Sequence, residues 1–244
     1  MKKALINTQT QPMQLPEPTL LENIFHKLDF EFMDLDILPN SLRSVLRDIL
    51  EVGNGAPFRK YYKWTTKSVH EYAKNNNITE IVELGAGTAP LTRHLIKYYP
   101  NWDVTFKITD LNPDSLNFSQ LEKADKRVKA KYDPLDFSKK ILGFENSLLL
   151  LSGTFHHIPE KKRKTVLSNL KLISPHVMIF EPLQSTISSF LFVFGALFSG
   201  FLAPFFHLNS KKFFRTFLWC WLLPIAPFLF LWDGWVSVTR IWNR

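Results

Sequence analysis

The chain has 244 residues, enough to bury one substantial core, and its single cysteine, Cys220, excludes an internal disulfide and fits a reducing compartment. Its formal net charge is +8, and the two lysines near the start are followed by no apolar run, so we expect no secretory signal there. Twelve of the 22 phenylalanines, five of the seven tryptophans and +4 of the net charge lie from residue 183 onward, which marks a compositional boundary.

Residues 1–76 are expected to form a polar lead-in followed by a helical cap. Apolar side chains recur at helical spacing over residues 20–28 and again over 42–50, where a polar residue precedes the stripe as a helix N-cap. The basic and aromatic stretch 59–64 has two interpretations. It contacts nucleic acid, lipid headgroups or a substrate, or it is a half-buried helix whose lysines lie in solvent.

Residues 77–183 alternate short apolar runs with helical patterns, which predicts an α/β fold with a doubly wound, mostly parallel, Rossmann-like sheet. Ligands of such sheets bind at the carboxyl ends of the strands, so functional residues are expected there. We expect strands at 78–84, 104–109, 128–132, 147–151 and 176–180, and helices at 90–99, 113–124 and 159–172.

The first of these strands ends in Glu83 and breaks at once into Gly85, Ala86 and Gly87, after which Pro90 opens a helix. Two glycines let the backbone turn sharply and approach a ligand closely, and the N–H groups of the following helix face an anion or polar group. A dinucleotide site needs G-x-G-x-x-G. Because Pro90 stands where the third glycine would be, the sequence disfavours a nicotinamide cofactor.

This stretch resembles motif I, acid-x-G-x-G-x-G, of the class I S-adenosylmethionine-dependent methyltransferases. Glu83, Gly85 and Gly87 match the motif, and Ala89 stands where the third glycine is usual. The resemblance covers residues 78–183 and implies that S-adenosyl-L-methionine is the cofactor, bound in part by this loop. The alternative is an ordinary turn between strand and helix that needs glycine only for its geometry.

The second strand ends at Asp110, 23 residues beyond Gly87. An acid at this place accepts hydrogen bonds from both ribose hydroxyls of a nucleoside. The resemblance assigns that role to Asp110, with Leu111 beside it. The alternative is that Asp110 caps the helix that follows.

After the third strand, the resemblance implies an acid that binds the adenine amino group and an apolar neighbour that lies against the ring. Asp136 and Phe137 match best, and Asp133 and Leu135 are the alternatives. The alternative is that these residues form a proline turn whose two carboxylates lie in solvent.

The loop after the fourth strand resembles motif IV of small-molecule methyltransferases, which places Thr154 near the cofactor and makes His156 or His157 a candidate general base. Alternatively, one histidine packs and the other bonds to the backbone. No third or fourth ligand accompanies the pair at metal spacing, so we expect no metal site. The Asn/Asp-Pro-Pro-Tyr/Phe box of nucleic-acid amino methyltransferases is absent, so we expect no nucleic-acid substrate.

Residues 184–244 form an apolar elaboration with two runs, 187–208 and 213–232, each near the length that crosses a bilayer. Lys211 and Lys212 in the link would have to cross if the core is cytoplasmic, contrary to the positive-inside rule. We therefore expect a monotopic segment that dips into one leaflet from the cytoplasmic side, rather than a transmembrane hairpin.

The last part of this elaboration has two interpretations. Asp233 and Gly234 lie between apolar stretches and favour a type I′ turn, so a β-hairpin is predicted over 228–242 that would supply the last two strands of the sheet. The alternative is one helix over residues 217–232.

Together these features predict an enzyme that transfers a methyl group from S-adenosylmethionine to O, N or C of a lipophilic small molecule or lipid at a membrane surface. Apolar side chains of the elaboration would cover the substrate. The alternative is a non-catalytic, membrane-associated protein that binds S-adenosylmethionine or acts as a scaffold.

Overall fold

The structure is a computed structural model that describes residues 30–35, 37–53, 58–139, 141–183 and 186–241. Two compact units divide the chain, Met1–Phe30 and Glu31–Arg244, and the elements described here belong to the second. The helix expected over residues 20–28 lies outside the described residues.

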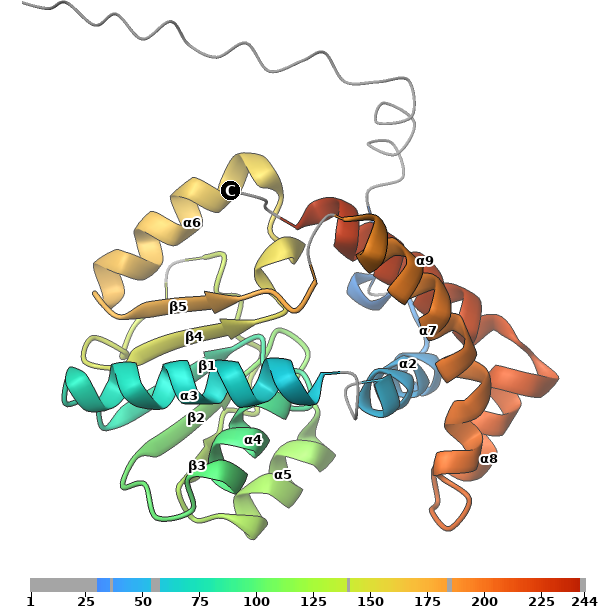
Figure 1. The fold of residues 1–244 in the computed structure, drawn as a ribbon, viewed down its shortest axis with the longest axis horizontal. Coiled ribbons are helices and arrows are strands. Elements are labelled where there is room, and N and C mark those ends of the chain that lie inside the picture. The colour runs from blue at the N-terminus through green and yellow to red at the C-terminus, as the bar shows by residue number, and fades with distance from the viewer. Residues whose placement is uncertain (1–29, 36, 54–57, 140, 184–185, 242–244) are drawn as a thin grey trace, which may run out of the picture. The chain divides into compact units, whose positions relative to one another are not determined.

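Five parallel strands form one sheet in the order β3-β2-β1-β4-β5 (Figure 1). This confirms the prediction of an α/β fold with a Rossmann-like parallel sheet. The order reverses between β1 and β4, which are hydrogen-bonded neighbours, and such a switch point opens a crevice at the carboxyl ends of the strands. The strands are β1 (Glu80–Leu84), β2 (Thr105–Thr109), β3 (Val128–Ala130), β4 (Leu148–Ser152) and β5 (Val177–Phe180).

Helices cover both faces of the sheet because the strands are apolar on both sides. On one face, Ile81 of β1 is buried with Leu91 and Leu95. On the other face, Val82 packs with Val166. The helices of this region are α3 (Arg59–Asn75), α4 (Pro90–Tyr98), α5 (Ser115–Ala124) and α6 (Glu160–Ile173), with the 3₁₀ turns η1 (Phe32–Asp34) and η2 (Phe155–His157).

A separate helical layer joins the segment before the sheet to the end of the chain. The apolar stripe of α2, which includes Val45 and Ile49, packs against Ala203, Cys220 and Ala226. Helix α2 contacts each of the helices α7, α8 and α9, and α7 packs along α9 (Figure 1). The helices are α2 (Asn40–Gly53), α7 (Ile187–Phe206), α8 (Phe213–Phe217), the π-helical turn η3 (Leu218–Leu222) and α9 (Ile225–Arg240).

The β-hairpin predicted over residues 228–242 is wrong, because α9 runs through it. Tertiary contacts account for the Asp-Gly pair instead. The Asp233 carboxylate accepts the backbone N–H groups of Phe32 at 2.7 Å and Met33 at 3.1 Å. A Cβ on Gly234 would lie 2.8 Å from Cγ1 of Val193, so glycine lets α9 approach α7 closely. A single helix over 217–232 is also wrong, because the chain bends by 82° between η3 and α9.

Candidate functional site

A cavity of about 490 Å³ opens where β1, β2 and β4 end, beside the switch point of the sheet. The loops that follow the first four strands line it, together with side chains of α2 and α3. Among the residues singled out in the sequence, Glu83 and His156 lie behind the lining. Those that line the cavity are Gly85, Ala86, Gly87, Asp110, Leu111, Asp136, Phe137, Thr154 and His157.

The glycine loop has the left-handed backbone that its sequence indicates. Gly85 has φ +67°, Gly87 has φ +57° and Ala89 has φ +55°, so Ala89 takes a conformation usual for glycine at a cost of about 1 kcal/mol. A Cβ on Gly85 would lie 2.9 Å from Cγ2 of Thr154 and 3.3 Å from Cε1 of Phe137. A Cβ on Gly87 would meet no atom within 4 Å, because that position faces open space.

Glu83 supports this loop from behind. Its carboxylate is buried and accepts hydrogen bonds from the backbone N–H and the hydroxyl of Thr92, in the first turn of α4. Burial raises the pKa of Glu83 to about 7, and the bonds from Thr92 oppose that rise. The structure thus gives Glu83 a positioning role, since it fixes the start of α4 relative to β1.

Asp110 joins the end of β2 to the glycine loop. Its Oδ2 accepts the N–H of Gly87 at 2.8 Å, and its Oδ1 accepts the N–H of Asn112 at 2.7 Å. Each carboxylate oxygen has a second lone pair, so Asp110 can still accept bonds from two ligand hydroxyls. Helix capping does not explain Asp110, because Asp114 is the N-cap of α5 and accepts the N–H of Asn117.

The loop after β3 places Asp136 and Phe137 at the cavity, and Leu135 lines it as well. Asp136 accepts two bonds from Ser138, at 3.0 and 2.6 Å. Burial opposes ionisation of Asp136, but the bonds from Ser138 and Lys139 outweigh it and lower its pKa. Asp133 is exposed and lies outside the lining, so of the two acids only Asp136 is placed to meet a ligand.

The two histidines have different surroundings. His156 is buried, and Glu181 accepts its backbone N–H at 3.2 Å and contacts its Nδ1 at 2.9 Å. His157 lines the cavity, with Nδ1 3.0 Å from Oδ2 of Asp34 and 3.5 Å from Oε2 of Glu31. Burial alone would lower the pKa of His157, but the two carboxylates raise it to about 9.

Sequence reasoning missed the acids before the sheet. Glu31 and Asp34 precede β1 by about 50 residues and belong to no motif that we recognised, yet they meet the His-His loop. Arg47 and Tyr61, from α2 and α3, also line the cavity. The one available signal was an acid among aromatic residues around position 31, which indicates a buried carboxylate with a specific partner.

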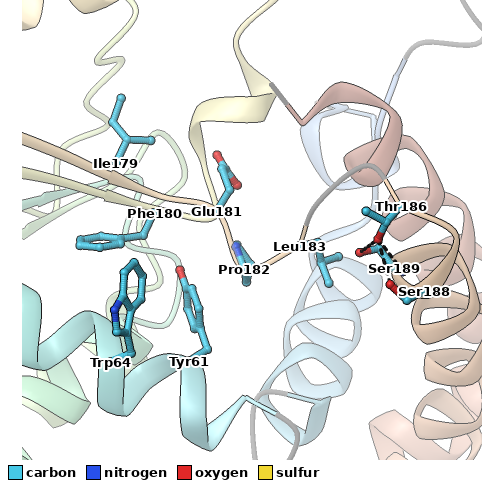
Figure 2. A pocket seen from close by; sticks show the side chains of 10 residues that line it. All are labelled: Tyr61, Trp64, Ile179, Phe180, Glu181, Pro182, Leu183, Thr186, Ser188 and Ser189. Carbon is cyan, nitrogen blue, oxygen red and sulfur yellow. Dashed lines mark hydrogen bonds between the residues drawn. The ribbon is translucent and has the colours of Figure 1, made fainter. Parts of the chain in front are cut away.

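A second cavity, of about 460 Å³, lies between α3, the end of β5 and the start of α7 (Figure 2). Tyr61 and Pro182 line both cavities. Figure 2 shows Tyr61 and Trp64 projecting from α3 beside Phe180, and the rings of Trp64 and Phe180 lie edge to face at 5.6 Å. The Tyr61 hydroxyl lies 3.4 Å from Oγ of Ser152, and burial raises the pKa of Tyr61 to about 12. Thr186, Ser188 and Ser189 lie on the far side of this cavity from Trp64, and Glu181 and Leu183 lie between the two sides (Figure 2).

An apolar face of α7 is exposed. Of the described helices, α7 alone is long and apolar enough to cross a membrane by itself, and the segments Phe213–Leu222 and Ile225–Arg240 meet that criterion only as a bent pair. Core helices of soluble proteins meet the same criterion, but they are mostly buried, so the exposure of α7 separates the two cases. In the most apolar part of α7, 28% is buried. The side chains on its outer stripe are Ile187, Leu191, Phe194, Phe198, Leu202 and Phe205, which are about half to four-fifths exposed.

The link between α7 and α8 is tied back to α2. Nζ of Lys212 lies 3.0 Å from Oδ1 of Asp48, and Nη2 of Arg215 donates to its Oδ2. Asp48 is buried, so these two cations neutralise it at the helical layer.

No protein-family model matches this sequence, and a comparison with curated proteins finds no match.

Proposed function

We propose that the protein is an S-adenosylmethionine-dependent methyltransferase that acts on a lipophilic small molecule or lipid at a membrane surface. The hydrogen bond between Gly87 and Asp110 carries this proposal, because it sets a carboxylate beside a glycine loop at the switch point of a parallel sheet. Such a juxtaposition suits the ribose of a nucleoside. The sequence resemblance to the methyltransferases selects the nucleoside.

The cavity has chemical groups that fit an adenosyl cofactor. Asp110 keeps free lone pairs for the ribose hydroxyls. Leu111 and Phe137 offer apolar surface to a flat ring, with Asp136 next to it as an acceptor for an exocyclic amino group. The open space at Gly87 leaves room for a polar group close to the backbone N–H groups of the loop. A volume of about 490 Å³ lies within the usual range of cofactor sites.

We propose that the molecule that receives the methyl group binds in the second cavity. The cofactor, when bound, supplies a methyl carbon that its sulfonium makes electrophilic. The residues of this chain then have to orient the acceptor and exclude water. Trp64 and Phe180 give the second cavity an apolar wall, and Tyr61 stands where the two cavities adjoin. The Tyr61 hydroxyl is protonated at neutral pH, so it can donate a hydrogen bond to a substrate oxygen or nitrogen at the junction.

We further propose that the exposed stripe of α7 inserts into one leaflet on the cytoplasmic side. A stripe of large apolar side chains along a 20-residue helix is typical of a membrane-inserting surface. A transmembrane hairpin is disfavoured, because Lys212 and Arg215 at the far end of α7 pair with Asp48 of α2. The second cavity includes Thr186, Ser188 and Ser189 at the start of α7, so a substrate leaving the leaflet would meet it directly.

Transfer of label tests the proposal. Purified protein is incubated with methyl-labelled S-adenosylmethionine and a membrane lipid extract, and label is measured in the lipid fraction. We expect label with the parent protein and with Asp133→Asn, an exposed carboxylate that serves as the control. We expect loss with Asp110→Asn, and a reduced rate with unchanged cofactor affinity for Tyr61→Phe.

Two results would change the assignment. Cofactor binding without transfer to any lipid or small molecule would leave a non-catalytic, membrane-associated binder or scaffold. Binding of NAD in place of S-adenosylmethionine would contradict the proposal altogether.

A further inference from the structure

We propose that Glu31, His156 and His157 form a binding site for a divalent transition metal ion of the zinc class. Their candidate ligand atoms all lie within 4.8 Å of one another. We expected no metal site because no further ligand lies near the two histidines in the sequence. In the structure, Glu31 contacts the His-His loop although it is about 125 residues away in the sequence. This inference is independent of the proposed cofactor.

The distances suit three ligands of one ion. Nε2 of His156 lies 3.9 Å from Oε1 of Glu31, which is too long for a hydrogen bond, and Nδ1 of His157 lies 3.5 Å from Oε2 of Glu31. Two ligands at about 2.0–2.1 Å from a tetrahedral ion lie roughly 3.3 Å apart. Small side-chain movements would therefore bring all three into coordination.

Glu181 prepares His156 as a ligand. A carboxylate only accepts hydrogen bonds, so the 2.9 Å contact between Oε2 of Glu181 and Nδ1 of His156 puts the ring proton on Nδ1. The lone pair of Nε2 then faces Glu31. Metal-binding histidines nearly always donate their other N–H to a carboxylate, carbonyl or water in this way.

Three carboxylates lie beside the two imidazoles. Glu181 contacts Nδ1 of His156, Asp34 contacts Nδ1 of His157, and Glu31 lies near both rings. The rings of His156 and His157 lie 4.4 Å apart. Imidazoles and carboxylates gathered in this way form a nitrogen and oxygen donor set for a divalent ion.

The ligands are held in place by the fold. Oε1 of Glu31 accepts the hydroxyl of Ser237 at 3.1 Å, and the side chains of Glu31 and His156 are almost fully buried. Nδ1 of His157 donates to Asp34 at 3.0 Å, so an ion bound at Nδ1 has to displace that proton, and Asp34 is then available as a further ligand. Because Asp34 and His157 line the first cavity, an ion has an entry path. Two imidazoles with carboxylates suit zinc, iron(II) or cobalt(II), whereas Mg²⁺ and Ca²⁺ prefer oxygen ligands.

Metal titration tests the site. Protein prepared without a polyhistidine tag and treated with a chelator is titrated with Zn²⁺ against a chromophoric competitor, and with Co²⁺ by visible absorption. We expect one equivalent of tightly bound Zn²⁺, a Co²⁺ spectrum of a nitrogen- and oxygen-ligated ion, and no competition from excess Mg²⁺. His70→Gln, a histidine stacked on Tyr99 away from the cluster, is the control and keeps parent affinity.

Substitutions locate the ion. We expect His156→Gln and Glu31→Gln to weaken Zn²⁺ binding at least 100-fold, and Glu181→Gln to weaken it about 10- to 100-fold through the orientation of His156. If a ligand variant does not fold, the parent stoichiometry and Co²⁺ spectrum still decide the question. Lack of stoichiometric Zn²⁺ binding by the parent, or equal affinity in folded His156→Gln, would overturn the proposal whether or not S-adenosylmethionine binds.

Discussion

The backbone N–H of Gly87 donates to Oδ2 of Asp110 at 2.8 Å, which ties the loop after β1 to the end of β2 across the mouth of the cavity. Gly87 and Asp110 lie 23 residues apart in the sequence, so the fold of the sheet brings them together. The bond fixes a carboxylate at a loop that has space in front of it. We expect this carboxylate to orient a ligand that has vicinal hydroxyls.

Gly85→Ala should destabilise the protein more than Gly87→Ala. Both substitutions strain a left-handed residue, but the new methyl group at position 85 also lies 2.9 Å from Cγ2 of Thr154. We expect about 1 kcal/mol lost at position 87 and about 2–4 kcal/mol at position 85, measured by chemical denaturation. Thr154→Ser removes that Cγ2 and should restore part of the loss in the double variant. Equal losses at the two glycines would show that Thr154 does not pack as described.

Glu83 should make stability depend on pH. Its folded pKa of about 7 lies above the ordinary value of 4.5, so the folded state holds an extra proton between these values. The stability from this group is full below about pH 4.5 and is lost as pH rises to about 7. Relative to Glu83→Gln, which cannot ionise, the parent should lose up to about 3 kcal/mol between about pH 4.5 and 8. Denaturation of both proteins across that range measures it, and a constant difference would contradict burial of the carboxylate.

The sequence predicted the sheet well because its signals are local. Each strand is a short run rich in apolar or β-branched residues, and the left-handed turn at Gly85 and Gly87 can be predicted from residue type alone. The position of Asp110 at the cavity could also be predicted, because the carboxyl ends of parallel strands lie at one edge of the sheet.

The errors lie where contacts distant in sequence decide the structure. An Asp-Gly pair normally indicates a hairpin, but here Asp233 binds the N–H groups of Phe32 and Met33, about 200 residues away. Glu31 likewise reaches His157 through the packing of the helical layer. No periodicity or motif records such partners, so neither contact could be predicted from the sequence.

Gly234→Ala should weaken the packing of α7 on α9. A Cβ there would lie 2.8 Å from Cγ1 of Val193, and overpacking of this kind costs about 1–3 kcal/mol. Gly195→Ala is the matched control, because a Cβ on this helical glycine meets no atom within 4 Å and should be neutral or stabilise by up to about 1 kcal/mol. Thermal unfolding compares them, and Val193→Ala should rescue Gly234→Ala. A stable Gly234→Ala variant would rule out the close crossing.

Phe198→Glu should release the protein from membranes. Phe198 is 61% exposed on the stripe of α7, and a charge there would have to enter the acyl region. We expect sedimentation with anionic lipid vesicles to fall at least tenfold while circular dichroism stays unchanged. Leu172→Glu, at a residue that is 85% exposed on α6, should sediment like the parent. Equal sedimentation of the two variants would exclude insertion of this stripe.

Calorimetric titration with S-adenosylmethionine and with NAD tests the central claim most directly. We expect stoichiometric binding of S-adenosylmethionine, no binding of NAD, and an affinity for S-adenosylmethionine about 10- to 100-fold lower in Asp110→Asn but unchanged in Asp133→Asn. A parent protein that does not bind S-adenosylmethionine, or a folded Asp110→Asn variant that binds it as tightly as the parent, would contradict the account.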